Sequence, residues 1–596
     1  MLTLRKVAFL LTRRQRLQAV VLLALMVIGM ALEMLGIGLV LPALMLMTRG
    51  VGTVGSPAAD SIAHLLGNPS REQIVGWGIL ALVGVYAVKT VFLAFLLWRQ
   101  MRFVWGVQAE LSYRLFARYL HQPYLFHLQR NSAYLIRNAT SEVGLFSHIL
   151  LGPALSFLAE GLVLAGIAAV LLIVEPVGTI IIAGSLATVA YIFHLSSHRL
   201  VSDWGSARHA HEGRRIQCLQ QGLGGVKDVL LLAREQYFLD QYQTHNLAVA
   251  RASRNHDTLH QTPRLALELL AVLGLAIFVL FKICSGVAVE SLVPTIGLFA
   301  AAAFRIMPSA NRVIAAVHHV QYAFPALAAL YDELSPANVA VAPHGDATPL
   351  TLQHSIRMTD VTFVYPGAAT PALSQIELTI ACGTTVGFIG GSGAGKTTLV
   401  NVLLGLLPPD SGRVEVDGGD IARQLRNWQR TIGYVPQAIF LTDDSLRRNI
   451  AFGIPADLID EAAVRDAVGA AQLEEFVATL PEGLDTPVGE RGVRLSGGQL
   501  QRIGIARALY HDPSVLVLDE ATSCLDTLTE RSVMRAVGAL HGEKTIIIVA
   551  HRLSTLQDCD RVFRLEAGRL VAEGDAGSMI GSSPRSVMER MSEAGR

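Results

Sequence analysis

The sequence predicts a two-part fold, in which a helical membrane domain precedes an α/β domain. Composition is the first observation: hydrophobic residues make up 52% of the chain, charged residues only 16%, and mean hydropathy is +0.43. Soluble domains carry about 25% charged residues. Second, the long apolar runs all fall before about residue 330, and shorter β-rich and helical segments alternate after it. Third, a glycine-rich loop at 390–397 directly follows an apolar, strand-like run.

Chain length and one polar stretch set the expected domain boundaries. With 596 residues, the chain is too long for a single hydrophobic core. Residues 335–350 are small, polar and proline-containing, which is typical of a linker. We therefore expect a transmembrane domain at 1–334, a linker at 335–350 and a second domain at 351–596.

Six apolar stretches are long enough to cross a bilayer, and they lie at 18–47, 74–98, 146–173, 177–196, 265–284 and 288–320. Basic residues cluster before the first stretch and in the second and fourth connections. The bias of basic residues toward the cytoplasm places the N-terminus and residues 351–596 on the cytoplasmic side of a membrane. The second and fourth connections are long and helical in pattern, so we expect these spans to continue well beyond the bilayer.

Four basic residues fall within or near the predicted spans, where charge is costly and often functional; they are Lys89, Arg264, Arg305 and Arg312. Arg305 and Arg312 are seven positions apart, which places them on one helical face. Together the four cations suit an anionic, phosphate-bearing substrate. The alternatives are that Arg264 and Arg312 extend toward the membrane surface, and that Lys89 pairs with a buried glutamate.

Charge and cysteine content exclude two classes of site. The formal net charge is +1, which leaves no electrostatic footprint for a nucleic acid, so we expect no such partner. The five cysteines are scattered without C-x-x-C spacing. They therefore indicate packing residues in a reducing setting and not a disulfide or zinc framework.

A phosphate-binding loop of the form G-x-x-x-x-G-K-[ST] lies between a predicted strand and a predicted helix, which is the context that this motif requires. Its residues are Gly390, Gly391, Ser392, Gly393, Ala394, Gly395, Lys396 and Thr397, followed by Thr398. The glycines allow backbone N–H groups to approach phosphate oxygens. Lys396 would neutralise the terminal phosphates of ATP, and Thr397 would hold Mg²⁺.

Further residues with matching chemistry follow this loop. The apolar run 515–518 ends in Asp519 and Glu520, as expected of a buried parallel strand that delivers two carboxylates at its end. Asp519 would hold Mg²⁺, and Glu520 would act as general base for the attacking water. His551 ends another apolar strand and would reach the γ-phosphate. Gln437 would contact Mg²⁺ or the attacking water.

Two further predictions concern ATP contacts. Tyr365 would stack on adenine, or it is simply a strand aromatic. The sequence 495–499 has no lysine, base or metal ligand, so it makes sense as a helix N-terminus that closes over a nucleotide held by another copy. Its polar and glycine residues are Ser496, Gly497, Gly498 and Gln499. Asp526, further along the chain, would also face the other copy. The two motifs together predict an ATPase that closes as a dimer.

These residues together resemble the ABC transporter superfamily over essentially the whole chain. The resemblance implies an exporter-type architecture, in which the six-span domain is fused to one nucleotide-binding domain. It implies that 390–397 is the Walker A motif, Gln437 the Q-loop, 495–499 the signature, and 523–526 the D-loop. It also makes Tyr365 the aromatic loop, Asp519 and Glu520 the Walker B pair, and His551 the switch histidine. Cys524 departs from the family pattern, where alanine is usual.

A narrower resemblance concerns the substrate. Residues 304–312, 262–264 and 224–228 look similar to segments of PglK-type flippases, which move polyprenyl-diphosphate-linked oligosaccharides in bacterial protein glycosylation. Lys89 stands where that family more typically has arginine. The resemblance implies a homodimeric flippase of such a substrate in the bacterial inner membrane. The alternatives are an exporter of drugs, lipids or peptides, a heterodimer, or a non-transporting ATP-gated channel or regulator, which the intact hydrolytic residues disfavour.

Overall fold

The computed structural model describes residues 2–39, 71–174, 176–284, 289–335, 350, 352–489, 492–521, 527–550 and 552–581. Contacts divide the chain into two compact units. The first, the membrane unit, comprises Met1–Gln122 and Phe126–Ala342, and the second, the nucleotide unit, comprises Pro343–Arg596 with Pro123–Leu125. Most of the predicted linker, 336–349, lies outside the described residues, so the domain boundaries stay a prediction.

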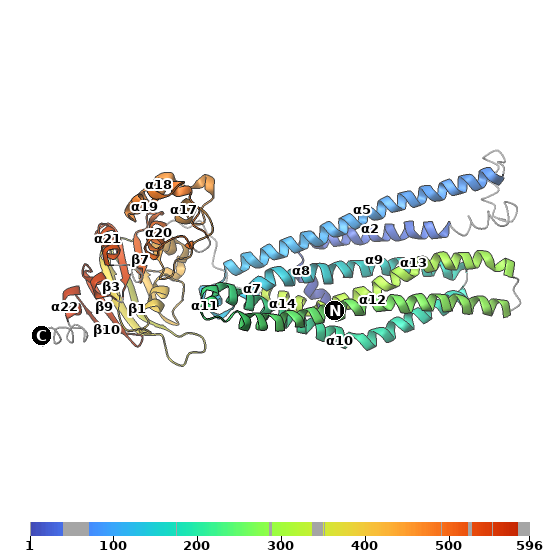
Figure 1. The fold of residues 1–596 in the computed structure, drawn as a ribbon, viewed down its shortest axis with the longest axis horizontal. Coiled ribbons are helices and arrows are strands. Elements are labelled where there is room, and N and C mark those ends of the chain that lie inside the picture. Colours follow the sequence, from blue (N-terminus) through green and yellow to red (C-terminus); the bar gives the residue numbers. More distant parts are fainter. Residues whose placement is uncertain are drawn as a thin grey trace. The chain divides into compact units, whose positions relative to one another are not determined.

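Six long helices run along the described part of the membrane unit (Figure 1). They are α2 (Arg13–Gly38), α5 (Arg71–Leu120), α9 (Gly152–Val174), α10 (Pro176–Gly224), α12 (Glu235–Cys284) and α13 (Val289–Tyr322). Each overlaps one predicted span. The 50 residues of α5 and of α12 correspond to about 75 Å of helix. A hydrocarbon core is only about 30 Å thick, so these helices extend beyond it, as the sequence predicted.

Shorter helices precede, join or follow the long ones. They are α1 (Leu2–Leu10), α6 (Tyr124–Gln129), α7 (Ser132–Arg137), α8 (Val143–Leu145), α11 (Val226–Leu231) and α14 (Phe324–Leu334), with two π-helical segments, η2 (Asn138–Glu142) and η3 (Phe146–Leu151). By length and composition, three helical stretches of the described chain qualify as membrane spans: Arg13–Gly36, Ile79–Leu120 and Ser132–Ile173. A fourth qualifies if the pair Ile306–Tyr322 and Phe324–Leu334, bent by 47°, is one span. The count of six spans therefore stays a prediction.

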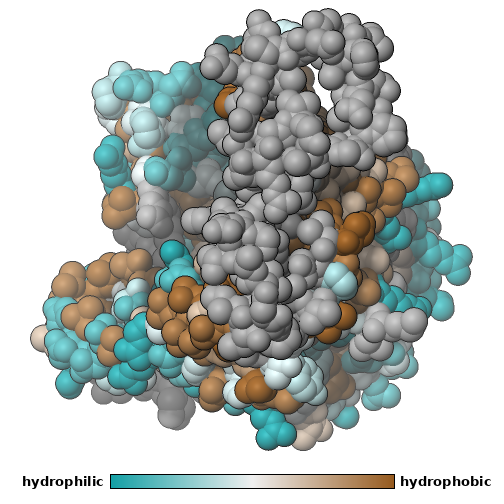
Figure 2. Space-filling model, turned by 90° about the vertical axis from the view of Figure 1, so that its right-hand side faces the viewer, coloured by the Kyte–Doolittle hydropathy of each residue, from teal (hydrophilic) through white to brown (hydrophobic). Residues whose placement is uncertain are grey.

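The exterior of the long helices carries many large apolar side chains, among them Val20, Leu80, Val91, Ile173 and Leu269. Figure 2 shows brown, hydrophobic residues reaching the surface among the atoms that are not grey. Exposed apolar surface of this extent is unfavourable in water and marks a membrane-facing or protein-facing region. The helices instead bury a narrower set against one another, including Leu111, Leu115, Phe146 and Leu330.

The nucleotide unit contains two sheets. A four-stranded antiparallel sheet has the order β2-β1-β4-β5, from β1 (Ser355–Phe363), β2 (Leu373–Ala381), β4 (Ser411–Val416) and β5 (Gly419–Asp420). A six-stranded sheet has the order β10-β9-β3-β8-β7-β6, from β3 (Thr385–Ile389), β6 (Ile432–Val435), β7 (Val515–Asp519), β8 (Thr545–Val549), β9 (Arg561–Glu566) and β10 (Arg569–Gly574). All neighbours in the second sheet are parallel except β9 and β10.

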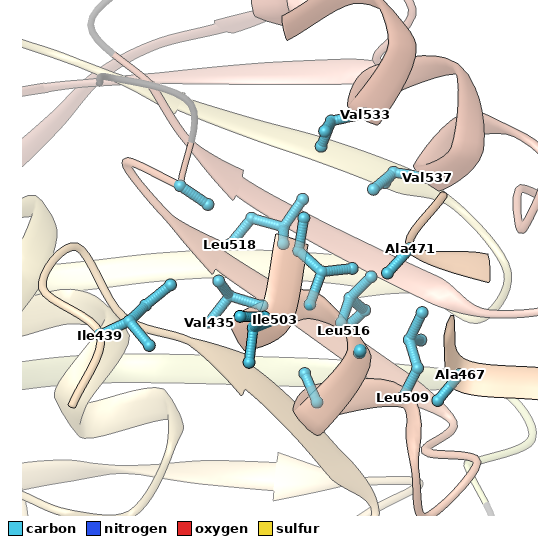
Figure 3. Close-up of a cluster of buried hydrophobic side chains, with 14 of the residues drawn as sticks. Val435, Ile439, Ala467, Ala471, Ile503, Leu509, Leu516, Leu518, Val533 and Val537 are labelled. Atoms are coloured by element: carbon cyan, nitrogen blue, oxygen red, sulfur yellow. The ribbon is translucent and has the colours of Figure 1, made fainter. Parts of the chain in front are cut away.

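The described part of the nucleotide unit also contains eight α-helices. They are α15 (Lys396–Leu403), α16 (Leu425–Arg430), α17 (Leu446–Ile450), α18 (Glu461–Ala470), α19 (Glu474–Thr479), α20 (Gly497–Leu509), α21 (Thr527–Gly538) and α22 (Ala576–Gly581). Of these, α16, α20 and α22 pack against strands of the larger sheet. Strand β7 is buried on both faces because alternate residues enter different cores. Leu516 and Leu518 join the cluster drawn in Figure 3, with Ile503 of α20. Val515 and Val517 join a second cluster. Burial on both faces holds the carboxyl end of β7 in a fixed position.

Candidate active site

The phosphate loop connects β3 directly to α15, as predicted. Gly395, the residue before α15, has a φ of +102°, a conformation that side chains rarely adopt. A Cβ atom there would lie 2.7 Å from the Ala372 carbonyl oxygen. A Cβ atom on Gly390 would lie 2.4 Å from the Leu565 carbonyl oxygen. Both positions therefore require glycine, and the loop folds tightly over the start of the helix.

Lys396 folds back into this loop. Its Nζ donates to the carbonyl oxygen of Gly390 at 2.9 Å and to that of Gly391 at 3.1 Å. Only 5% of the residue is exposed. Burial lowers the pKa of Lys396, and the negative charges of Glu520 and Asp519 oppose that shift. The lysine thus brings a concentrated positive charge to the loop that is predicted to hold phosphates.

The hydroxyls of the next two residues differ in exposure. Thr397, the predicted Mg²⁺ ligand, is exposed in the first turn of α15. Thr398 is buried, and its Oγ1 lies 3.2 Å from the hydroxyl oxygen of Tyr365. Tyr365 also packs edge-on against Phe363, with ring centroids 5.0 Å apart. Tyr365 is therefore tied to the phosphate-loop helix, and its stacking on adenine stays a prediction.

Strand β7 delivers Asp519 and Glu520 beside the loop. Asp519 is almost fully buried and accepts a hydrogen bond from the Tyr434 hydroxyl at 3.4 Å. Burial, and then the neighbouring charge of Glu520, raise the pKa of Asp519. A cation bound beside Asp519 would favour the ionised form and oppose this shift. The contact from Tyr434, on the neighbouring strand β6, was not anticipated from sequence, because it depends on the parallel register of β6 and β7.

Glu520 adopts a strained backbone conformation with a φ of +52°. Its backbone N–H donates to the Val549 carbonyl oxygen at 3.0 Å. Its Oε2 accepts a hydrogen bond from Gln437 Nε2 at 2.6 Å. The structure therefore brings together the predicted base and the predicted Q-loop residue, which are 83 positions apart in the chain.

Ser496 begins α20, as expected for a helix N-terminus. Its Oγ accepts from the Gln499 backbone N–H at 3.3 Å, and Gln499 Oε1 accepts from the Ser496 backbone N–H at 2.9 Å. These reciprocal bonds form a capping box. Ser496 and Gly497 are exposed, so the helix end is accessible to an anion. His551 and Asp526 lie outside the described residues, and their predicted roles stay predictions.

Comparisons with known proteins give the family of this chain. Residues 373–523 match the family model described as "ABC transporter". The "ATP-dependent lipid A-core flippase" of Dechloromonas aromatica (strain RCB) is 31% identical over 544 residues, which is 89% of this chain and 91% of the relative. The protein of the same name from Thiobacillus denitrificans (strain ATCC 25259 / T1) is 30% identical over 523 residues, 86% of this chain and 88% of the relative. The chain belongs to the ABC transporter family.

A solved structure extends the similarity to the whole fold of this ABC transporter. It is titled "Structure of a bacterial Atm1-family ABC exporter with ATP bound". Its TM-score is 0.77 at 23% identity, over 97% of this chain and 98% of the other. The predicted architecture, a helical membrane part joined to an α/β part in the ABC exporter fold, is thereby confirmed.

Three of the four predicted substrate cations of this ABC transporter pair with carboxylates in the part of the chain that the structure describes. Lys89 Nζ lies 3.1 Å from Glu33 Oε1, and both side chains are largely buried. This is the internal pairing that the sequence offered as an alternative. Arg264 Nε lies 2.8 Å from Glu268 Oε1 at an exposed position on the same helix.

Arg312 also has a carboxylate partner. It donates to Glu160, which is nearly buried and also accepts from the Ser309 hydroxyl at 2.6 Å. The side chain of Arg305 lies outside the described residues. A substrate role for the four cations stays a prediction. To bind an anion, Lys89, Arg264 and Arg312 would each have to release the carboxylate partner or contact both groups at once.

A histidine cluster joins three helices of this ABC transporter and was not anticipated from sequence. It contains His194 of α10, His256 and His260 of α12, and His318 and His319 of α13. The ring centroids of His319 lie 4.9 Å from His256 and 4.8 Å from His260. Within the described residues, no three histidine, cysteine or acidic side chains are placed to hold a metal ion. Two signals were present in the sequence, the i,i+4 pair on α12 and the adjacent pair on α13.

Proposed function

We propose that this ABC exporter is a homodimeric flippase that uses ATP to move an anionic glycolipid across the bacterial inner membrane. The observation that carries the proposal is the match to flippases over 86–91% of both chains, combined with the intact site around Lys396 and Glu520. Family membership and the residues of the site both support ATP hydrolysis. The identity of the substrate is a more specific proposal.

Lys396 and the loop amides would hold the phosphates of ATP. Thr397, Gln437 and Asp519 would hold Mg²⁺, since hydroxyl, amide and carboxylate oxygens are the ligands that this ion prefers. When bound, Mg²⁺ neutralises charge that develops on the transferred phosphoryl group. Glu520 would take the proton of the attacking water, and His551 would stabilise charge at the γ-phosphate.

Two copies would supply each complete site. The signature helix begins at Ser496 and carries an exposed, capped N-terminus, but it has no cationic side chain of its own in 495–499. It suits contact with the phosphates of a nucleotide bound to the Lys396 loop of the second copy. Asp526 would lie at the same interface. Dimers are typical of this family, and a heterodimer is the alternative outcome.

Two substrates of one class have specific support. The relatives are named for lipid A-core, which favours a glycolipid of that kind. The resemblance of 304–312 to PglK-type flippases favours a polyprenyl-diphosphate-linked oligosaccharide. Arg305 and Arg312 would meet the anionic headgroup, with Lys89 and Arg264 contributing, while the lipid tail stays in the bilayer.

Reconstitution in liposomes tests the proposal. The purified protein should move fluorescent polyprenyl-diphosphate-linked oligosaccharide, or lipid A-core, in the presence of ATP and Mg²⁺, and should not move phosphatidylethanolamine. Glu520→Gln is the matched control, which should bind ATP without transport. Transport of phosphatidylethanolamine, a drug or a peptide in place of both glycolipids would refute the glycolipid assignment.

A further inference from the structure

The signature helix α20 holds the segment that follows Gln437. Arg507, near the end of this helix, donates from its guanidinium to the carbonyl oxygen of Phe440 at 2.7 Å. It also donates to the carbonyl oxygen of Asn449 at 2.8 Å and to Asn449 Oδ1 at 3.2 Å. The guanidinium lies over the ring of Phe452, 4.6 Å from its centroid. One side chain thus fixes three points of the chain between 440 and 452.

A glycine provides a second contact on the same face of α20. A Cβ atom on Gly504 would lie 2.4 Å from Ile439 Cδ1. Ile439 is mostly buried against the core that Figure 3 shows. Gly504 precedes Arg507 by three positions, so the two residues face the same direction. The helix therefore contacts Ile439 and Phe440, the second and third residues after Gln437.

The segment that follows Gln437 is also held together by Asn449, which is fully buried. Asn449 Oδ1 accepts from the Thr442 backbone N–H at 3.0 Å, and Asn449 Nδ2 donates to the Thr442 carbonyl oxygen at 3.0 Å. Nδ2 also lies 3.1 Å from the Ser445 carbonyl oxygen. Residues 442–449, which include the start of α17, are therefore braced by Asn449, and Arg507 attaches this segment to α20.

We propose that Arg507 and Gly504 are positioning residues that couple the signature to the catalytic base. Residues 496–499 begin the helix on which Arg507 lies. Gln437, just before the segment that this helix contacts, donates to Glu520. A helix of 13 residues is stiff and about 20 Å long. Movement of the signature toward a nucleotide is therefore transmitted to the contact between Gln437 and Glu520. The inference rests on the proposed roles of Gln437, Glu520 and the signature.

The guanidinium fork is essential to this arrangement. Arginine offers several donors in a fixed plane, whereas lysine is a point charge with a flexible stem. Burial lowers the pKa of Arg507 to about 10, so the group remains charged at neutral pH. Charge-assisted bonds to carbonyl oxygens are stronger than neutral ones. Arg507→Lys therefore keeps the charge but loses the simultaneous contacts to Phe440 and Asn449.

The test measures ATP hydrolysis by the full-length dimer in liposomes. Arg507→Lys should lower kcat by about tenfold while KM for ATP stays within about twofold, because the residue acts after binding. The Mg²⁺ concentration for half-maximal activity should rise. Arg502→Lys is the matched control, since Arg502 lies on the same helix and donates to the Gln472 carbonyl oxygen at 2.9 Å. It should leave kcat and KM unchanged.

A second pair of variants separates coupling from folding. Gly504→Ala should lower kcat because the added methyl group displaces Ile439, and adding Ile439→Ala should restore it by making room. Unchanged kcat in both Arg507→Lys and Gly504→Ala, or equal losses in Arg507→Lys and Arg502→Lys, would overturn the inference. Glu520→Gln is assayed in parallel. Sustained hydrolysis by this variant would refute Glu520 as the base, and with it the proposed function on which the coupling rests.

Discussion

Gln437 donates from Nε2 to Oε2 of Glu520 across 2.6 Å. The bond joins the Q-loop to the strained end of β7, where the Glu520 backbone has a φ of +52°. The side chain that would remove a proton from water is therefore oriented by a residue from a different segment. A general base must be correctly oriented for efficient proton transfer. The contact with Gln437 therefore supports a prediction for Glu520.

Glu520→Gln should abolish steady-state ATP hydrolysis and leave ATP binding intact. The amide preserves the size of the side chain but cannot accept a proton, and loss of a general base costs about 10²–10⁴-fold in rate. Hydrolysis is measured by phosphate release and binding by a fluorescent ATP analogue. Turnover at the parental rate would remove Glu520 from the mechanism.

Gly395→Ala should weaken ATP binding sharply with a modest loss of stability. The methyl group would meet the Ala372 carbonyl oxygen, and a φ of +102° is strained for alanine by about 1–3 kcal/mol. Equilibrium nucleotide binding and thermal unfolding check the two effects separately. Gly391→Ala, where a Cβ atom meets nothing within 4 Å, is the comparison for steric effects. Equal ATP affinity in Gly395→Ala and the parent would contradict this account of the loop.

Lys89→Met should destabilise the membrane unit by about 3–5 kcal/mol, because it removes the cation beside the buried Glu33 carboxylate. Adding Glu33→Gln should recover most of that loss, since replacing a whole buried pair is much less costly than breaking it. Unfolding of the purified protein in detergent is the measurement. Destabilisation of the double variant beyond that of Lys89→Met would show that the pair is not the source of the effect.

Arg305→Ala combined with Arg312→Ala should slow transport of the anionic glycolipid several-fold and leave basal ATP hydrolysis near the parental rate. Lys227→Ala, an exposed cation on α11 outside the predicted spans, is the control. Flipping is followed by accessibility of a fluorescent headgroup to a quencher. Unchanged glycolipid transport in the double variant would refute the anion-binding role.

Acid should destabilise the membrane unit through the histidine cluster. Burial lowers the pKa of His256 and of His260, although the neighbouring Asp257 opposes both shifts. The unfolded chain therefore binds more protons, so stability is full above about pH 6.5. It is lost as the pH falls from there through the lowered pKa values. His256→Phe keeps a ring against Tyr322 but cannot titrate. Thermal unfolding at pH 8 and pH 5 should show a smaller difference in this variant.

Local pattern was sufficient for the parts of the fold that depend on neighbouring residues. Strand β3, the phosphate loop and α15 follow one another without interruption, and their glycines and lysine are recognisable because each acts within a few positions of the next. The six long helices were predicted for the same reason: an apolar run needs only its own length to indicate a span. Ser496 was expected at a helix start, and it forms the capping box of α20.

The contacts between distant segments were not predictable from pattern. Lys89 and Glu33 are 56 positions apart, and a buried glutamate was expected as one alternative for Lys89, but which glutamate it meets depends on how α2 and α5 rotate against each other. The histidine cluster likewise requires α10, α12 and α13 to meet at one level.

The phosphate-loop motif, the two adjacent carboxylates Asp519 and Glu520, and the apolar membrane half are visible in the sequence alone, since each of these features is contiguous. The folded structure adds that Gln437 contacts Glu520, that Lys89 and Arg312 pair with carboxylates, and that Arg507 binds the segment after Gln437. The physical reason is that such contacts form between side chains whose directions are set by helix rotation and strand register. Neither quantity is carried by a stretch of neighbouring residues.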